Sequence, residues 1–155
     1  MEICTIGYEG LSLPQFLELL RQHGVRHLID IREAPVSRKA GFAKAALAEA
    51  LGTAGIRYTH LRALGCPKPI RDRYKASGDE ERYRRDFGIY LAAQGEALEA
   101  VRRALAATPT CLMCFEADPA RCHRSLVAAA LAAPGLAVRH IPVRPPSPQT
   151  ELDFG

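Results

Sequence analysis

The chain has 155 residues, a length that suits one domain with a buried core. Hydrophobic residues make up 48% and charged residues 25%, as in globular proteins that fold in water, and no apolar run is long enough to cross a membrane. The formal net charge of +4 permits an anionic partner without requiring one. The first residues lack the features of a signal peptide, and an odd number of cysteines, five, argues against a disulfide framework. We therefore expect a cytoplasmic protein with reduced thiols.

Predicted strands and helices alternate along the chain. Short runs rich in Val, Ile and Leu indicate strands, and a capping box of Ser12 and Gln15 indicates the start of a helix. Asp118-Pro119 is typical of an N-cap and first helical residue. In chain order we expect a strand at 3–8, a helix at 12–24, a strand at 25–32, a helix at 44–51, a strand at 56–61, a helix at 80–107 with a break near Gly88 or Gly95, a strand at 110–116, a helix at 118–133 and a strand at 136–141.

This order predicts an α/β fold, with a mainly parallel sheet and helices on both faces in a Rossmann-like three-layer arrangement. Residues 1–141 would form one domain, and the proline-rich residues 142–155 an extended tail. Ligands of such sheets bind beyond the carboxyl ends of the strands. Polar side chains that follow the predicted strands, those of Glu9, Asp30 and Glu116 among them, should therefore gather at one edge.

Three of the five cysteines lie in one segment, CLMCFEADPARCHRS, at 111–125. Cys111 and Cys114 have the Cys-x-x-Cys spacing of zinc sites, but the segment is predicted to be a strand. Residues three apart on a strand point to opposite faces, so one metal ion would not reach both sulfurs. We expect Cys111 in the core, and neither a metal ion nor another cofactor.

Cys122 lies in the first turns of the helix predicted after Asp118. There the helix dipole and the nearby cationic side chains would lower the pKa of its thiol. The alternative is that Cys122 faces the sheet and packs with Leu126 and Ala129, and the sequence leaves both possibilities open. His123 and Arg124 would then flank it and be more exposed.

Several motifs resemble a known bacterial family, the domain of unknown function 488. They are TIGYEG, the strand ending in DIR followed by P-x-S-x-x-x-GF, LG-x-P and CFEADPARCHRS. The resemblance extends from about Thr5 to His140, and the Cys-His-Arg triplet at 122–124 is the family's signature. It implies a fold and a site but no reaction.

Two further groupings of residues could bind a ligand. Asp30 and Arg32 share one face of a predicted strand and would pair with each other or bind a common ligand. Arg, Lys and Tyr alternate in residues 56–87, which suits phosphate contact and base stacking, although a solvated, salt-bridged helix is slightly favoured by the interspersed acidic residues. The loop with Ser37 and Arg38 would be a mobile substrate loop.

These observations favour an enzyme that acts on nucleic acid or another phosphate-bearing substrate. The alternatives are a non-catalytic module that binds DNA or RNA, and a thiol redox protein using Cys114 and Cys122. The candidate catalytic residues are Glu9, Asp30, Glu116, Cys122 and His123. The candidate anion- and substrate-binding residues are Tyr8, Arg32, Ser37, Arg38 and Arg124.

The tail gives an independent indication of a partner. Gln149, Leu152 and Phe154 resemble the Q-x-x-L-x-F peptide by which bacterial replication and repair proteins dock on the sliding clamp. In an extended chain Leu152 and Phe154 lie on one face. We expect this segment to connect the protein with DNA metabolism, unless it packs on its own domain.

Overall fold

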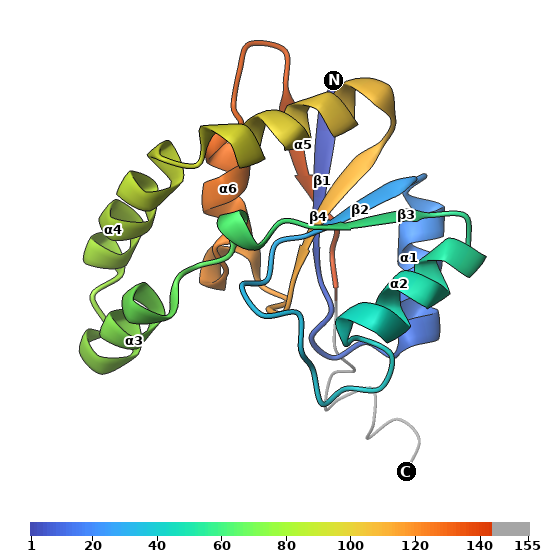
Figure 1. Cartoon of the computed structure of the whole chain (residues 1–155), viewed down its shortest axis with the longest axis horizontal. Coiled ribbons are helices and arrows are strands. Elements are labelled where there is room, and N and C mark those ends of the chain that lie inside the picture. Colours follow the sequence, from blue (N-terminus) through green and yellow to red (C-terminus); the bar gives the residue numbers. More distant parts are fainter. Residues whose placement is uncertain (144–155) are drawn as a thin grey trace, which may run out of the picture.

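A computed structural model describes residues 1–143 and contains one five-stranded sheet (Figure 1). All strand pairings are parallel, and the strand order is β3-β2-β4-β1-β5. The predicted α/β fold with a parallel sheet is therefore confirmed. The strands are β1 (Glu2–Gly7), β2 (His27–Asp30), β3 (Arg57–His60), β4 (Thr110–Cys114) and β5 (Ala137–His140).

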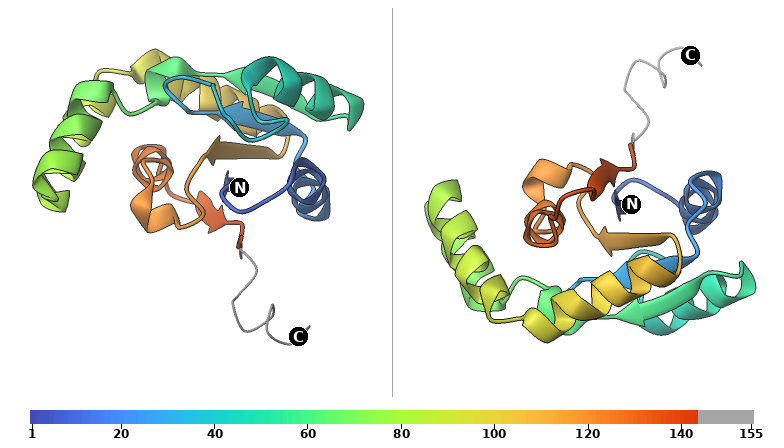
Figure 2. Two further views of the ribbon diagram at one scale, coloured as in Figure 1. Left: turned by 90° about the horizontal axis from the view of Figure 1, so that it is seen from below. Right: turned by 90° about the horizontal axis from the view of Figure 1, so that it is seen from above.

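Helices cover both faces of the sheet (Figure 2). On one face, α1 (Leu13–Gln22) and α2 (Lys44–Thr53) pack Phe16 and Leu47 into a core that includes Met113 of β4. On the other face, α5 (Gly95–Ala107) and α6 (Arg124–Ala130) enclose a second core with Leu112. Successive residues of β4 thus serve opposite cores, as the pleat of a strand requires.

Two more helices, α3 (Lys68–Ser77) and α4 (Glu80–Ala92), lie side by side at one end of the molecule (Figures 1 and 2). The predicted order of elements contained no helix at the position of α3, although a solvated, salt-bridged helix was the slightly favoured interpretation of residues 56–87. α3 ends at Gly78, whose φ of 67° is the left-handed conformation that glycine adopts readily. The predicted long helix is divided between α4 and α5 at residues 93–94, next to Gly95, while Gly88 stays inside α4.

The capping box at the start of α1 is confirmed, since the Ser12 hydroxyl oxygen accepts from the Gln15 backbone N–H and the Gln15 side-chain oxygen accepts from the Ser12 backbone N–H.

The prediction of a helix at 118–133 is wrong in its first turn. Asp118 caps only a short 3-10 turn, Pro119–Arg121, and Cys122 returns to an extended conformation (φ −126°, ψ 149°). α6 therefore begins at Arg124, and Cys122 precedes the helix that was expected to contain it.

The register of the sheet brings the strand ends together. Gly7 pairs with Cys114, Asp30 pairs with Met113, and His60 pairs with Asp30. Side chains that follow β1, β2 and β4 consequently lie at the same edge, as the sequence predicted.

Across residues 1–143, the helices are all too short or too polar to traverse a lipid bilayer.

Candidate active site

A cavity of about 420 Å³ lies at the carboxyl edge of β1, β2 and β4, a size within the usual range for small-molecule sites. Its walls combine predicted site residues with residues that the sequence did not single out. The predicted ones are Tyr8, Arg32, Ser37, Glu116 and His123. Cys114, which belongs to the thiol redox alternative, also lines it, and the residues that were not singled out include Glu33, Cys66, Arg71 and Phe115.

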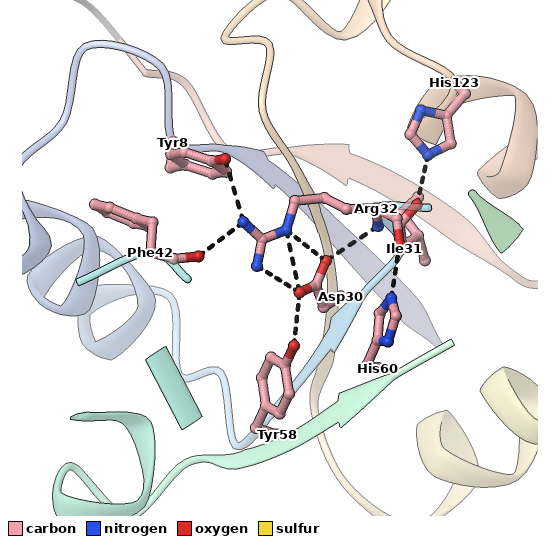
Figure 3. A network of polar contacts seen from close by, with 8 residues as sticks. All are labelled: Tyr8, Asp30, Ile31, Arg32, Phe42, Tyr58, His60 and His123. Atoms are coloured by element: carbon pink, nitrogen blue, oxygen red, sulfur yellow. Dashed lines mark hydrogen bonds and ion pairs between the residues drawn. The ribbon is translucent and has the colours of Figure 1, made fainter. Parts of the chain in front are cut away.

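Asp30 and Arg32 form a buried ion pair (Figure 3), and Arg32 also lines the cavity. The Arg32 Nη2 lies 2.7 Å from Asp30 Oδ2, and Nε lies 2.9 Å from Oδ1. Tyr58 donates its hydroxyl hydrogen to Asp30 Oδ2 at 2.6 Å, and Asp30 is completely buried. Asp30 therefore does not line the cavity but fixes the guanidinium of Arg32.

The other end of the Arg32 guanidinium holds neighbouring segments in place. Its Nη1 donates to the Tyr8 hydroxyl at 3.2 Å and to the Phe42 carbonyl oxygen at 2.7 Å (Figure 3). The Tyr8 and Phe42 rings stack with their centroids 4.5 Å apart. Arg32 thus connects β1 with the loop that carries Ser37, and the same loop forms one wall of the cavity.

Two imidazoles flank the end of β2, where successive carbonyl groups leave the sheet (Figure 3). His123 Nε2 lies 2.7 Å from the Ile31 oxygen, and His60 Nε2 lies 2.7 Å from the Arg32 oxygen. A carbonyl only accepts hydrogen bonds, so each Nε2 carries the hydrogen and each Nδ1 has a free lone pair when the ring is neutral. Burial lowers the pKa of His123 to about 4, which keeps its ring neutral at physiological pH.

Cys114 and Cys122 meet at the edge of the cavity. Their sulfur atoms are in bonding contact, as in a disulfide, although the Cα atoms lie 7.4 Å apart. The Nδ1 of His123 lies 3.7 Å from the Cys122 sulfur. Cys122 itself does not line the cavity, whereas Cys114 and His123 do.

Arg124 was expected to be more exposed than Cys122, and this expectation is wrong. Its side chain is completely buried, because the fold supplies acceptors from distant parts of the chain. It donates to the Thr5 hydroxyl oxygen at 3.0 Å, to the Ala117 carbonyl oxygen at 3.0 Å and to the Glu116 carbonyl oxygen. Arg124 therefore holds the turn after β4 and lies outside the walls of the cavity.

The two candidate acids near this turn have different surroundings. Glu116 faces the cavity, and burial raises the pKa of its carboxyl group. Glu9 is exposed, and its Oε1 accepts a hydrogen bond from the Ala117 backbone N–H at 3.0 Å, so it holds the turn from outside. Of the two, only Glu116 can reach a molecule in the cavity.

The cationic side chains around the cavity are partly paired. Arg71 of α3 lines the cavity and lies 2.7 Å from Glu33, while Arg38 is exposed and does not line it. Elsewhere on α3 and α4, Lys68 pairs with Asp72 and Arg84 with Glu80. These ion pairs agree with the expectation that residues 56–87 contain a solvated, salt-bridged helix, not a surface that binds nucleic acid.

The sequence analysis missed three residues that line the cavity, namely Arg71, Cys66 and Phe115. Arg71 and Cys66 arrive through the packing of α3, and burial raises the pKa of the Cys66 thiol to about 11. Phe115 follows β4 directly and is 45% exposed, which is unusual for a large apolar side chain next to a core strand. The position after a central strand was its only signal in the sequence.

The family model described as "Domain of unknown function DUF488" matches residues 12–131. Neither the curated proteins nor the solved structures contain a significant match to this chain. The match covers α1 to α6, and with them most of the cavity wall.

Proposed function

The chain belongs to the DUF488 family, and we propose that it is an enzyme that acts on a nucleotide, a nucleic acid or another phosphate-bearing substrate. One observation carries the proposal. The cavity places an exposed aromatic ring, a guanidinium group and a carboxyl group within one lining, on Phe115, Arg71 and Glu116.

Phe115 is suited to bind a nucleobase. Its ring is 45% exposed and packs edge-on against Tyr8, with 5.3 Å between the ring centroids. This contact holds the ring on one side, and the exposed part of the ring is available to a ligand. Unpaired bases commonly stack on such aromatic side chains in nucleic-acid-binding proteins.

Arg71 is suited to bind a phosphate group. Its side chain is 44% exposed, so its ion pair with Glu33 is screened by water and contributes little to stability. A terminal phosphate carries more negative charge than a carboxylate, and any phosphate group can accept two parallel hydrogen bonds from a guanidinium. A phosphate in the cavity would therefore compete well with Glu33 for Arg71.

Glu116 is placed to exchange a proton with a substrate held between these groups. It lies directly after Phe115, and both side chains line the cavity. A general acid or base must lie within hydrogen-bond reach of the atom it serves, and among Glu9, Asp30 and Glu116 only the last lines the cavity.

Phe115→Ala is expected to weaken nucleotide binding by about 1–3 kcal/mol, which is roughly 5- to 150-fold in Kd, because the stacking platform is lost. Binding of nucleoside mono-, di- and triphosphates and of short single strands can be measured by calorimetry. Ile89→Ala is the matched control, since Ile89 on α4 is also an exposed apolar side chain but does not line the cavity. Equal affinities of the two variants would contradict the proposal.

Glu116→Gln separates an enzyme from a binding module. The variant should bind the same ligands and lose turnover of whichever ligand the wild-type chain converts. Binding by the wild-type chain without any conversion would instead favour the non-catalytic, nucleic-acid-associated module.

A thiol redox protein is a second candidate, favoured by the contact between Cys114 and Cys122. Thiol–disulfide exchange requires two sulfurs within bonding distance and a path for the attacking thiolate. Cys114 lines the cavity and Cys122 lies behind it, so only one sulfur would be accessible from the cavity.

We further propose that residues 149–154, which lie outside the described part of the chain, dock on the bacterial sliding clamp. The full-length chain should bind the clamp with a Kd on the order of micromolar, about −8 kcal/mol. Leu152→Ala combined with Phe154→Ala should remove most of this binding, because two apolar anchors would supply most of the energy. Thr150→Ala, at a variable position of the motif, is the control. A wild-type chain that gives no surface plasmon resonance signal with the clamp would end this proposal.

A further inference from the structure

We propose that Cys114, Cys122 and His123 bind a divalent metal ion of the zinc class at the wall of the cavity. Each residue offers one ligand atom, and these atoms all lie within 4.8 Å of one another. Two sulfurs and one imidazole nitrogen are soft ligands, which select zinc over magnesium or calcium.

The hydrogen bond of His123 orients its ring for coordination. Nε2–H donates to the Ile31 carbonyl oxygen at 2.7 Å, so Nδ1 carries the lone pair. The Nδ1 atom lies 3.7 Å from the Cys122 sulfur. Histidines that bind metals usually donate their other ring N–H to a carbonyl or carboxylate, which fixes the ring orientation. His123 has this arrangement.

The buried charge of Arg124 would stabilise the thiolates of Cys114 and Cys122 once a reductant has separated the two sulfurs. Its guanidinium is completely buried, and no carboxylate of the described residues lies within 4.0 Å of it. A buried cation without an anionic partner is costly. Its Nη1 lies 3.3 Å from the Cys114 sulfur, and its backbone N–H lies 3.4 Å from the Cys122 sulfur. Both donors would stabilise thiolates, the form in which cysteine binds metals.

The backbone spacing of the two cysteines also suits a bridging ion. Their Cα atoms lie 7.4 Å apart, whereas disulfides usually span about 4.4–6.8 Å. Two thiolates on one tetrahedral zinc ion, each at about 2.3 Å from the metal, have sulfurs roughly 3.8 Å apart and so tolerate a wider backbone separation. The ion would bind the reduced pair, the two thiols that a glutathione-type thiol reductant forms from the disulfide, and binding would release the two thiol protons to solvent.

Three protein ligands leave one position of a tetrahedral ion open. Cys114 and His123 line the cavity, so this position would face its interior, where Glu116 Oε2 lies 3.7 Å from the Cys114 sulfur. An open position is typical of catalytic rather than structural zinc. A role of the ion in catalysis rests on the proposed function, whereas the binding of the ion to this site does not.

The test uses the full-length chain, purified with a reducing agent, stripped with a chelator and titrated with Zn²⁺ or Co²⁺ alone. We expect one ion per chain by elemental analysis and sulfur-to-cobalt charge-transfer absorption. Cys122→Ser and His123→Gln should weaken Co²⁺ binding at least tenfold. Cys66→Ser, which alters a cysteine in the same cavity but outside the cluster, should leave Co²⁺ affinity unchanged.

X-ray absorption of the zinc-loaded wild-type chain provides a second measurement that depends on no variant. Sulfur at about 2.3 Å and nitrogen at about 2.0–2.1 Å from the metal would support the site. The proposal is overturned if the reduced chain binds no Co²⁺, if Cys66→Ser weakens binding as much as Cys122→Ser, or if a Cys114–Cys122 disulfide persists in a reducing glutathione buffer. None of these measurements uses a substrate. Their outcome is therefore independent of the nucleotide-binding test of the proposed function.

Discussion

Arg32→Met should lower the free energy of unfolding by about 3–5 kcal/mol, because it leaves the Asp30 carboxylate buried without its cation. Asp30 is completely buried, and Arg32 is 7% exposed. Although burial opposes the charged form of Arg32, the hydrogen bonds and charge of Asp30 outweigh it and raise the pKa of the guanidinium. Urea denaturation followed by circular dichroism measures the change.

A double-mutant cycle with Asp30→Asn identifies the ion pair as the cause. Each single variant should be strongly destabilised, and the double variant should be less destabilised than the sum, since the second substitution removes the unpaired charge. Arg84→Met, which breaks the exposed pair with Glu80, serves as the control and should hardly shift the urea midpoint. Strict additivity of Arg32→Met and Asp30→Asn would show that the two residues act separately.

Gly7→Ala should lower the free energy of unfolding at least as much as Arg32→Met does. The expected loss exceeds the roughly 1–3 kcal/mol that is usual for overpacking. A Cβ at Gly7 would overlap the backbone carbonyl of Glu116 and touch the Arg124 guanidinium. Neither can move easily, because the carbonyl belongs to the turn after β4 and the guanidinium is buried. The thermal unfolding midpoint of the purified variant is the measurement.

Gly52→Ala is the matched control for Gly7→Ala. Gly52 lies in α2 with open space around it, so alanine there should stabilise by about 0.4–1 kcal/mol through the unfolded state and helix propensity. If Gly7→Ala unfolds at the wild-type temperature, the close approach between β1 and the turn after β4 is not a constraint on the fold.

The features that the sequence predicted correctly depend on local patterns. The Ser12–Gln15 capping box and the apolar strands need only a few neighbouring residues, and the alternation of strands and helices then implies a parallel sheet. This was enough to predict that Asp30 and Glu116 would lie at the same edge. It was also enough to place Cys111, completely buried, in the core.

The features that it did not predict depend on contacts between distant segments. Arginine is normally exposed, and only the fold shows that Thr5 and the turn after β4 provide acceptors for a buried Arg124. Cys122 was assigned to a helix because Asp118-Pro119 starts both α-helices and 3-10 turns. Its extended backbone brings it to Cys114, and no spacing rule for metal ligands covers this combination of a strand end and a turn.

The strand order also determines when the sheet can form during synthesis. β1 and β2 are consecutive in the chain but not neighbours in space, and the gap between them is filled by β4, residues 110–114. Until the ribosome has released these residues, the inner edges of β1 and β2 expose unpaired N–H and C=O groups. The central pairings therefore have long sequence separations, such as Cys4 with Cys111, which is the kind of topology that folds slowly. A nascent chain that ends before β4 has the helices α1 to α5 but lacks the strand that joins its two halves.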